Sequence, residues 1–168
     1  MITSTDFCSL MASFPTGVAI LTTFGPDGTV RGMTCSSVCS VTLTPPTLLV
    51  CVRQGSATLD SILLRSMFAV NLLHNAAAAT ARLFASGAPD RFEAVRWHID
   101  ADAAGPHLTD DAHAVAHCHV SRTQPIGDHV VVFGEVYRIR QQTADWQPLM
   151  YGMRHYAAWP ASSANLHS

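Results

Sequence analysis

Gly32-Met33-Thr34-Cys35-Ser36-Ser37-Val38-Cys39-Ser40 places small polar side chains in the middle of a segment that we expect to form one long strand, 31–43. Such a run fills a core poorly, because buried hydroxyls need hydrogen-bond partners. Small side chains let a flat ligand approach the backbone, and hydroxyls can bind the polar edge of that ligand. From composition alone, a polar strand that faces water is an equally good interpretation.

Outward from this stretch, short apolar and β-branched runs predict strands, and apolar residues at helical spacing predict three helices. The predicted strands are 18–23, 48–53, 68–73, 115–122, 129–140 and 148–151, and the predicted helices are 6–14, 56–64 and 76–84, with a loop over 87–105. Asp6 and Ser56 are the expected helix caps. Most strands are joined by short turns, which favours an antiparallel barrel with short peripheral helices over a doubly wound parallel sheet.

Size and composition predict a single domain over 1–160, followed by a flexible tail over 161–168. The net charge of −2 and the absence of a basic stripe argue against a nucleic-acid partner. Five cysteines at irregular spacing argue against a disulfide framework. With no signal peptide and no long apolar run, the chain is expected to be cytoplasmic and away from membranes. Its 48% hydrophobic and 13% charged residues would suit a dimer interface.

The histidines raise the question of a metal site. On a strand, His117 and His119 share one face and Cys118 points to the other. A structural zinc site needs four ligands, and no CxxC completes one here. We therefore expect no metal, and a solvated histidine face over a buried Cys118. The sequence also has no GxGxxG after a strand, no P-loop and no GxSxG elbow.

Several short stretches match one known family in order and spacing from about residue 7 to residue 159. They are Phe14-Pro15-Thr16-Gly17-Val18, Asp27-Gly28, Gly32 to Val41, Pro45-Pro46, Leu48 to Val52, Phe68 to Leu73, Phe84-Ala85, Asp90-Arg91-Phe92, Gly127-Asp128-His129 and Pro148 to Tyr151. Through them the chain resembles the flavin reductase family with the FMN-binding split-barrel fold. Val38 departs from the family, which usually has an aromatic there, and Ala76 to Ala79 occupy a region that often holds a Gln.

The resemblance implies a mainly β, Greek-key split barrel with peripheral helices and a flavin site, FMN or FAD, along the polar stretch. The implied flavin contacts are Gly32, Met33, Thr34, Cys35, Ser36, Ser37, Ser40, Val50, Cys51, Val52, Ser56, Ala57, Thr58, Arg91 and Phe92. The residues from Ser56 to Thr58 open a helix, whose free amides suit the flavin phosphate, although Asp60 in that first turn opposes an anion. Ser56 as a plain cap, and Arg91 as a surface charge, are the simpler alternatives.

His129 is the candidate catalytic residue, because the resemblance puts this histidine where NADH or NADPH docks. It could bind the nicotinamide carboxamide or stabilise charge on the reduced flavin; a turn histidine without a role is the alternative. Other candidates on the nicotinamide side are Pro15, Thr16, Tyr151, Arg154 and Tyr156. For the last three, core packing or a dimer contact is an equal alternative.

The predicted function is an NAD(P)H:flavin oxidoreductase. The resemblance implies a homodimer that passes reduced flavin transiently to a partner monooxygenase. Two alternatives remain: a flavin-binding electron carrier of the same fold, and a heme- or ligand-binding split-barrel module.

Overall fold

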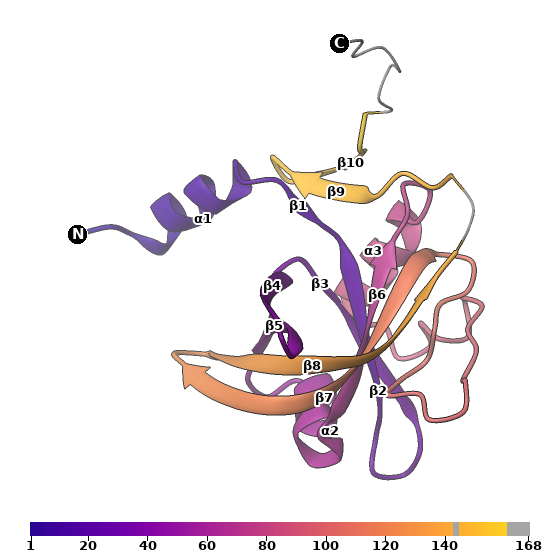
Figure 1. Ribbon diagram of the computed structural model, residues 1–168. Helices are drawn as coiled ribbons and strands as arrows, with labels where there is room; N and C mark the ends of the chain where they lie inside the picture. The colour runs from indigo at the N-terminus through magenta and orange to yellow at the C-terminus, as the bar shows by residue number, and fades with distance from the viewer. Residues whose placement is uncertain (143–144, 161–168) are drawn as a thin grey trace.

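The computed structural model describes residues 1–142 and 145–160, and strands dominate it (Figure 1). The large sheet contains β2 (Ala19–Phe24), β3 (Val30–Cys35), β4 (Cys39–Leu43), β5 (Pro46–Arg53), β6 (Met67–Leu73), β7 (Ala112–Ile126) and β8 (His129–Gln141). All pairs are antiparallel, in the order β3-β2-β6-β7-β8-β5-β4. This confirms the expected mainly β, antiparallel split-barrel fold. The predicted tail, 161–168, lies outside the described residues.

A second sheet lies above the large one in Figure 1 and orders β1 (Thr16–Gly17), β9 (Leu149–Gly152) and β10 (His155–Ala158) as β1-β9-β10. The sequence predicted β9 but not β1 or β10; the two residues of β1 carry too little periodicity to be recognised. This sheet borders the point where α1 (Ser4–Ala12) joins the body of the molecule.

The expected single strand 31–43 is wrong, because the chain leaves the sheet at Ser36 and re-enters it at Cys39. The two halves, β3 and β4, form opposite edges of the seven-stranded order. Ser37 lies in the break, and its Oγ accepts from Cys51 N at 3.0 Å and donates to Cys51 O at 3.1 Å. A side chain thus takes the place of a ladder hydrogen bond, and it joins the break to β5.

Two apolar clusters hold the sheet together. One fills the barrel interior with residues such as Val50, Phe68 and Val132, and α2 (Ala57–Arg65) adds Leu59 and Ile62. The other lies under α3 (Ala78–Ser86), and its largest fully buried side chains are Ile20, Leu73, Phe84, Leu108 and Leu149. Burial of both clusters supplies the main driving force for this fold.

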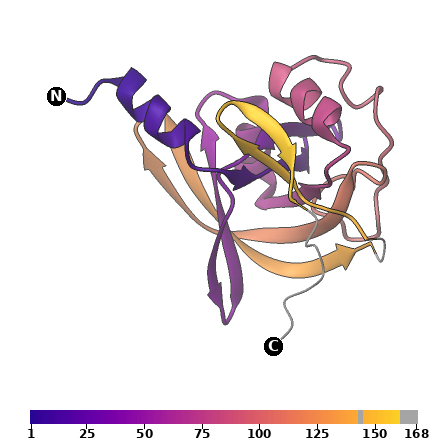
Figure 2. The ribbon, with the colours of Figure 1, turned by 90° about the horizontal axis from the view of Figure 1, so that it is seen from above.

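The helices follow the sequence pattern with shifted starts. Thr3, not Asp6, caps α1: Thr3 Oγ1 accepts from Asp6 N, and the Asp6 carboxylate accepts from Thr3 N in return. None of the α1 residues is buried, and the helix projects from the body (Figures 1 and 2). Ser56 caps α2 as predicted, and α3 begins two residues later than predicted.

The predicted loop between α3 and β7 contains only an isolated bridge, between His98 and His107. In the part of the chain that the structure describes, no helix is long and apolar enough to cross a membrane.

Candidate functional site

A groove of about 630 Å³ opens at the break between β3 and β4. We call it the split groove; α1, β1, the β3–β4 connection and the β9–β10 region line it. It brings together five residues that the sequence predicted for the site: Thr16, Ser36, Ser37, Tyr151 and Arg154. Its volume lies in the range of small-molecule and cofactor sites.

A smaller hollow of about 210 Å³ shares Ser36 and Tyr151 with the split groove and adds Thr34 and Tyr156. The Tyr151 and Tyr156 ring centroids are 5.0 Å apart, and Arg82 Cζ lies 5.0 Å from the Tyr156 centroid. Burial raises the pKa of Tyr156, Tyr151 adds to this effect, and Arg82 opposes it. Tyr156 therefore keeps a neutral phenol that can donate a hydrogen bond.

His129 lies at the other end of β5, in a cluster that we call the hairpin end: Arg53, Ser56, Asp128 and His129. Arg53 pairs with His129 across the β5–β8 ladder, so the two side chains lie on the same face of the sheet. His129 Nδ1 donates to Asp128 Oδ1 at 2.8 Å, and this bond holds the pKa of Asp128 below its usual range. The half-exposed ring of His129 keeps Nε2 for another partner.

The N-terminus of α2 borders the hairpin end. Ser56 Oγ accepts from Leu59 N at 3.1 Å, and Ser56 O accepts from Asp60 N at 3.1 Å. The amides of Ala57 and Thr58 precede these bonds, so they are the first-turn donors that remain for water or an anion. Ser56 is therefore a helix cap and also part of a potential anion site.

Ser37 connects the split groove to the hairpin end. It lines the groove, and its hydroxyl bonds the backbone of Cys51, two residues before Arg53 on β5. A ligand that extends along β5 could therefore reach both regions.

Several predicted flavin contacts lie inside the barrel. The side chains of Met33, Cys35, Val50 and Val52 belong to the interior cluster or pack against it. Burial raises the pKa of the Cys35 thiol, whose Sγ lies 3.2 Å from Ser37 Oγ. These side chains point into the barrel interior and support the strands that border the site.

Gly32 and Arg91 lie on the α3 side of β3. Arg91 Nε donates to Gly32 O at 3.0 Å, and Arg91 Nη1 donates to Ala88 O at 2.6 Å. Phe92 is buried edge-on to Phe84, with ring centroids 4.9 Å apart. The structure places Arg91 and Phe92 in a packing role, away from the residues that line the split groove.

Two other predicted residues lie apart from the groove lining. Ser40 lines a largely apolar hollow of about 480 Å³ over β4, β5 and β8. Pro15 is exposed and packs against Gly152, where an added Cβ would come within 3.1 Å of Pro15 Cβ.

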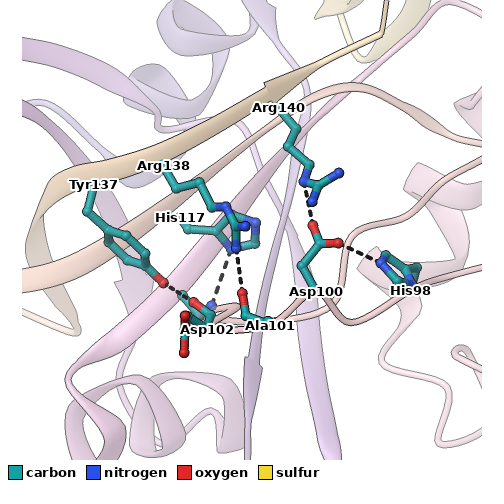
Figure 3. A network of polar contacts seen from close by, with 9 residues as sticks. His98, Asp100, Ala101, Asp102, His117, Tyr137, Arg138 and Arg140 are labelled. Carbon is teal, nitrogen blue, oxygen red and sulfur yellow. Dashed lines mark hydrogen bonds and ion pairs between the residues drawn. The ribbon is translucent and has the colours of Figure 1, made fainter.

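The histidine-rich strand is not the solvated face that the sequence predicted. His117 is fully buried, because the loop before β7 folds over it and Ala104 N donates to His117 Nδ1 at 3.2 Å. Figure 3 shows how the same loop is held, with the Asp100 carboxylate between His98 Nε2 and Arg140 Nε, each at 2.6 Å. Over residues 1–142 and 145–160, no three His, Cys, Asp or Glu side chains are arranged to hold a metal. Burial raises the pKa of the Cys118 thiol to about 12, so it is not a nucleophile.

Sequence reasoning missed part of the groove lining. The groove residues not predicted as contacts are Cys8, Met11, Ala12, Phe14, Val38 and Cys39.

Comparison with known proteins identifies the family of this chain. The family described as "Flavin reductase like domain" matches residues 11–160. A curated "Flavin reductase (NADPH)" of Lentzea aerocolonigenes is 44% identical over 158 residues, covering 94% of this chain and 91% of that protein.

Two solved structures share the fold. One is the NADH:FAD oxidoreductase SgcE6 of Streptomyces globisporus C-1027, in complex with NAD and FAD fragments. Its TM-score is 0.87 at 28% sequence identity, and the match covers 98% of this chain and 99% of that chain. The other is a homolog of nitrilotriacetate monooxygenase component B from Mycobacterium thermoresistibile, with a TM-score of 0.87, 29% identity, and coverage of 96% and 89%.

Proposed function

The chain belongs to the family of flavin reductase like domains, and we propose that it is an oxidoreductase that reduces FMN or FAD with NADH or NADPH. The observation that carries this proposal is the meeting of five predicted residues in the split groove, which Ser37 connects to the capped N-terminus of α2. The NADPH-dependent relative and the NADH-dependent structural neighbour support the reaction class and leave both nicotinamide cofactors as candidates.

The residues present fit a flavin. The groove is large enough for a flat ring, and the exposed Ser36 offers its hydroxyl in both adjoining hollows. Ser37 contributes mainly by holding the groove wall, since Cys51 already uses its donor and one acceptor position. The amides of Ala57 and Thr58 suit a phosphate. A bound flavin supplies the hydride chemistry, while the protein binds and orients the reactants.

His129 would act on the nicotinamide side of the reaction. Its Nδ1 proton is held by Asp128, which leaves Nε2 to meet a carboxamide or to stabilise developing negative charge. Hydride transfer needs no protein acid, and correct placement of the two rings can contribute several kcal/mol. Thr16, Tyr151 and Arg154 line the split groove and would help to hold the dinucleotide.

We also propose that reduced flavin passes to a partner monooxygenase, as the likeness to a homolog of a monooxygenase component suggests. A homodimer is part of the same proposal. Its supporting observation is the apolar hollow of about 480 Å³ over β4, β5 and β8, where Leu43 and Ile139 are well exposed.

A kinetic test measures oxidation of NADH and NADPH by the purified chain with FMN or FAD. We expect turnover in at least one combination, and His129→Ala should lower kcat/KM for the nicotinamide about tenfold, the effect of one lost hydrogen bond. Affinity for the flavin, measured by fluorescence quenching, should stay unchanged in this variant.

His119→Ala is the matched control, because His119 is an exposed histidine on β7 outside the hairpin end. Absence of oxidation in all four combinations would contradict the proposed reaction. Tight flavin binding without oxidation would instead identify an electron carrier.

A further inference from the structure

We infer that Arg82 and Arg154 bind the 2′-phosphate of NADPH, so that this chain uses NADPH in preference to NADH. The inference rests on the proposed function and names its nicotinamide substrate. The two arginines are distant in the sequence. Arg82 lies on α3, Arg154 lies in the turn between β9 and β10, and α3 meets the second sheet beside this turn (Figures 1 and 2).

The exposed Arg82 lies over an aromatic pair of the second sheet. Its Cζ is 5.0 Å from the centroid of the Tyr156 ring, and the Tyr156 and Tyr151 centroids are also 5.0 Å apart. A guanidinium held over an aromatic ring keeps the N–H donors at its edge free for another partner. Across residues 1–142 and 145–160, the Arg82 side chain makes no hydrogen bond or ion pair.

Arg154 approaches from the hairpin turn of the same sheet. Met153 and Arg154 have φ of 49° and 62°, the left-handed conformation of a two-residue hairpin turn, and Met153 N donates to Ala12 O at 2.6 Å. The exposed Arg154 side chain lines the split groove and, in the part of the chain that the structure describes, has no polar side-chain partner. Main-chain bonds therefore fix the turn, and the guanidinium remains for a ligand.

Tyr151 joins the two arginine positions. It lines the split groove together with Arg154, and it lines the hollow of about 210 Å³ together with Tyr156, the ring under Arg82. A dinucleotide with its nicotinamide near His129 and its middle in the split groove would therefore bring its adenosine end to the two tyrosines. The 2′-phosphate of NADPH is attached to the ribose at this end.

The charges around this position favour a phosphate over a hydroxyl. Burial raises the pKa of Tyr156, Tyr151 adds to this effect, and Arg82 opposes it; no carboxylate is among these causes. Among the described residues, no Asp or Glu forms an ion pair with Arg82 or Arg154. A carboxylate is the usual partner of the 2′-hydroxyl of NADH, whereas arginine suits the 2′-phosphate of NADPH, whose oxygens match the planar donors of a guanidinium.

The kinetic test compares kcat/KM for NADPH with kcat/KM for NADH. Wild type should favour NADPH by about tenfold or more, the effect of a charge-assisted hydrogen bond. Arg82→Gln and Arg154→Gln should each lower this ratio about tenfold. Arg82→Lys keeps the positive charge but loses the planar pair of donors, so its ratio should fall less than that of Arg82→Gln.

A binding measurement tests the same site without turnover. Isothermal titration calorimetry compares adenosine 2′,5′-bisphosphate with adenosine 5′-monophosphate, which lacks the 2′-phosphate. Wild type should bind the bisphosphate more tightly, and Arg82→Gln should reduce this difference. Arg65→Gln is the matched control, because Arg65 is exposed in the last turn of α2, at the opposite end of the molecule from β9 and β10 (Figure 1). It should keep the wild-type values in both measurements.

Equal use of NADH and NADPH by wild type would overturn the inference. A wild-type ratio in either Arg82→Gln or Arg154→Gln would also overturn it, as would equal binding of the two adenosine phosphates by wild type. If wild type oxidised neither dinucleotide but still preferred the bisphosphate, the proposed reaction would fail and the phosphate site would stand.

Discussion

At the scale of single residues, the hydroxyls of the polar stretch are explained by their distant partners. Thr34 Oγ1 donates to Ala81 O at 2.6 Å, and Ser37 exchanges two bonds with the backbone of Cys51. Ser36 is exposed in the groove. Three hydroxyls of this stretch therefore have three different partners. Thr34 bonds α3, Ser37 bonds β5, and Ser36 faces the groove, where it can contact a ligand.

Gly32 belongs to the same stretch for a steric reason. A Cβ at this position would lie 2.8 Å from Leu21 O, 3.0 Å from Phe92 Cζ and 3.2 Å from Phe84 Cε1. The backbone oxygen cannot move without breaking the β2–β3 ladder. We expect Gly32→Ala to lower the free energy of unfolding by roughly 1–3 kcal/mol, as overpacking does, measured by urea denaturation.

Gly17→Ala is the control, because nothing lies within 4 Å of an added Cβ there. Its change should stay within about 0.5 kcal/mol. Equal stability of the two variants would show that the Gly32 site can relax.

At the scale of elements, the loop before β7 is held to β7 and β8 by polar contacts, which are buried at His117 and exposed at Tyr137 and Arg138. Tyr137 Oη donates to Asp102 O at 2.7 Å, and Arg138 donates to Ala101 O (Figure 3). Burial lowers the pKa of His117, with Arg138 adding to this effect. Burial alone would raise the pKa of Asp100, but the His98 hydrogen bond and the Arg140 charge hold it below its usual range.

These shifts predict a loss of stability in mild acid. The unfolded chain protonates His117 near its ordinary pKa of 6.5, whereas the folded chain does so only at lower pH. The unfolded state therefore binds more protons, and the free energy of unfolding should fall between about pH 7.5 and about pH 5.5. Urea denaturation across this range measures the slope, which should become shallower in His117→Gln.

His119→Gln changes an exposed histidine on the same strand and should keep the wild-type slope. His107 and His113, whose pKa values are also lowered by burial, account for the dependence that remains in His117→Gln. Identical slopes in all three proteins would rule out His117 as the source.

At the scale of the whole molecule, large apolar side chains remain exposed on two separate parts. One is the projecting α1, where Phe7 and Leu10 are exposed. The other is the hollow over β4, β5 and β8, in which Leu43 is 85% exposed and Ile139 is 62% exposed. Contiguous apolar surface of this kind is typical of protein interfaces.

The proposed homodimer predicts that a charge in this hollow separates the subunits. In Ile139→Lys, light scattering should give the molar mass of one chain instead of two. Burying an unpaired charge in the interface is unfavourable in free energy, so the subunits separate. Leu64→Lys, at an exposed position of α2 outside the hollow, should remain dimeric. A monomeric wild type would contradict the proposal directly.

Local patterns predicted much of the fold and the types of residue in the site. The β-branched runs gave most strands, and Ser56 was recognised as a cap before α2. The break at Ser36 to Val38 could not be found in this way, since small polar residues alternate there as they would in a continuous strand. The bond from Arg91 Nε to Gly32 O joins residues that are 59 positions apart, so no local pattern could predict it.

By itself, the sequence determined the antiparallel barrel, the family and the stretch around which the site is built, because periodicity, turns and motif order are local properties. Only the tertiary structure decided that Ser37 seals the barrel, that His117 is buried and that Arg53 lies beside His129. Each of these depends on which distant backbone lies opposite a side chain. The pairing of distant strands in the closed sheet decides which backbone lies opposite each side chain. The local sequence pattern carries no information about that pairing.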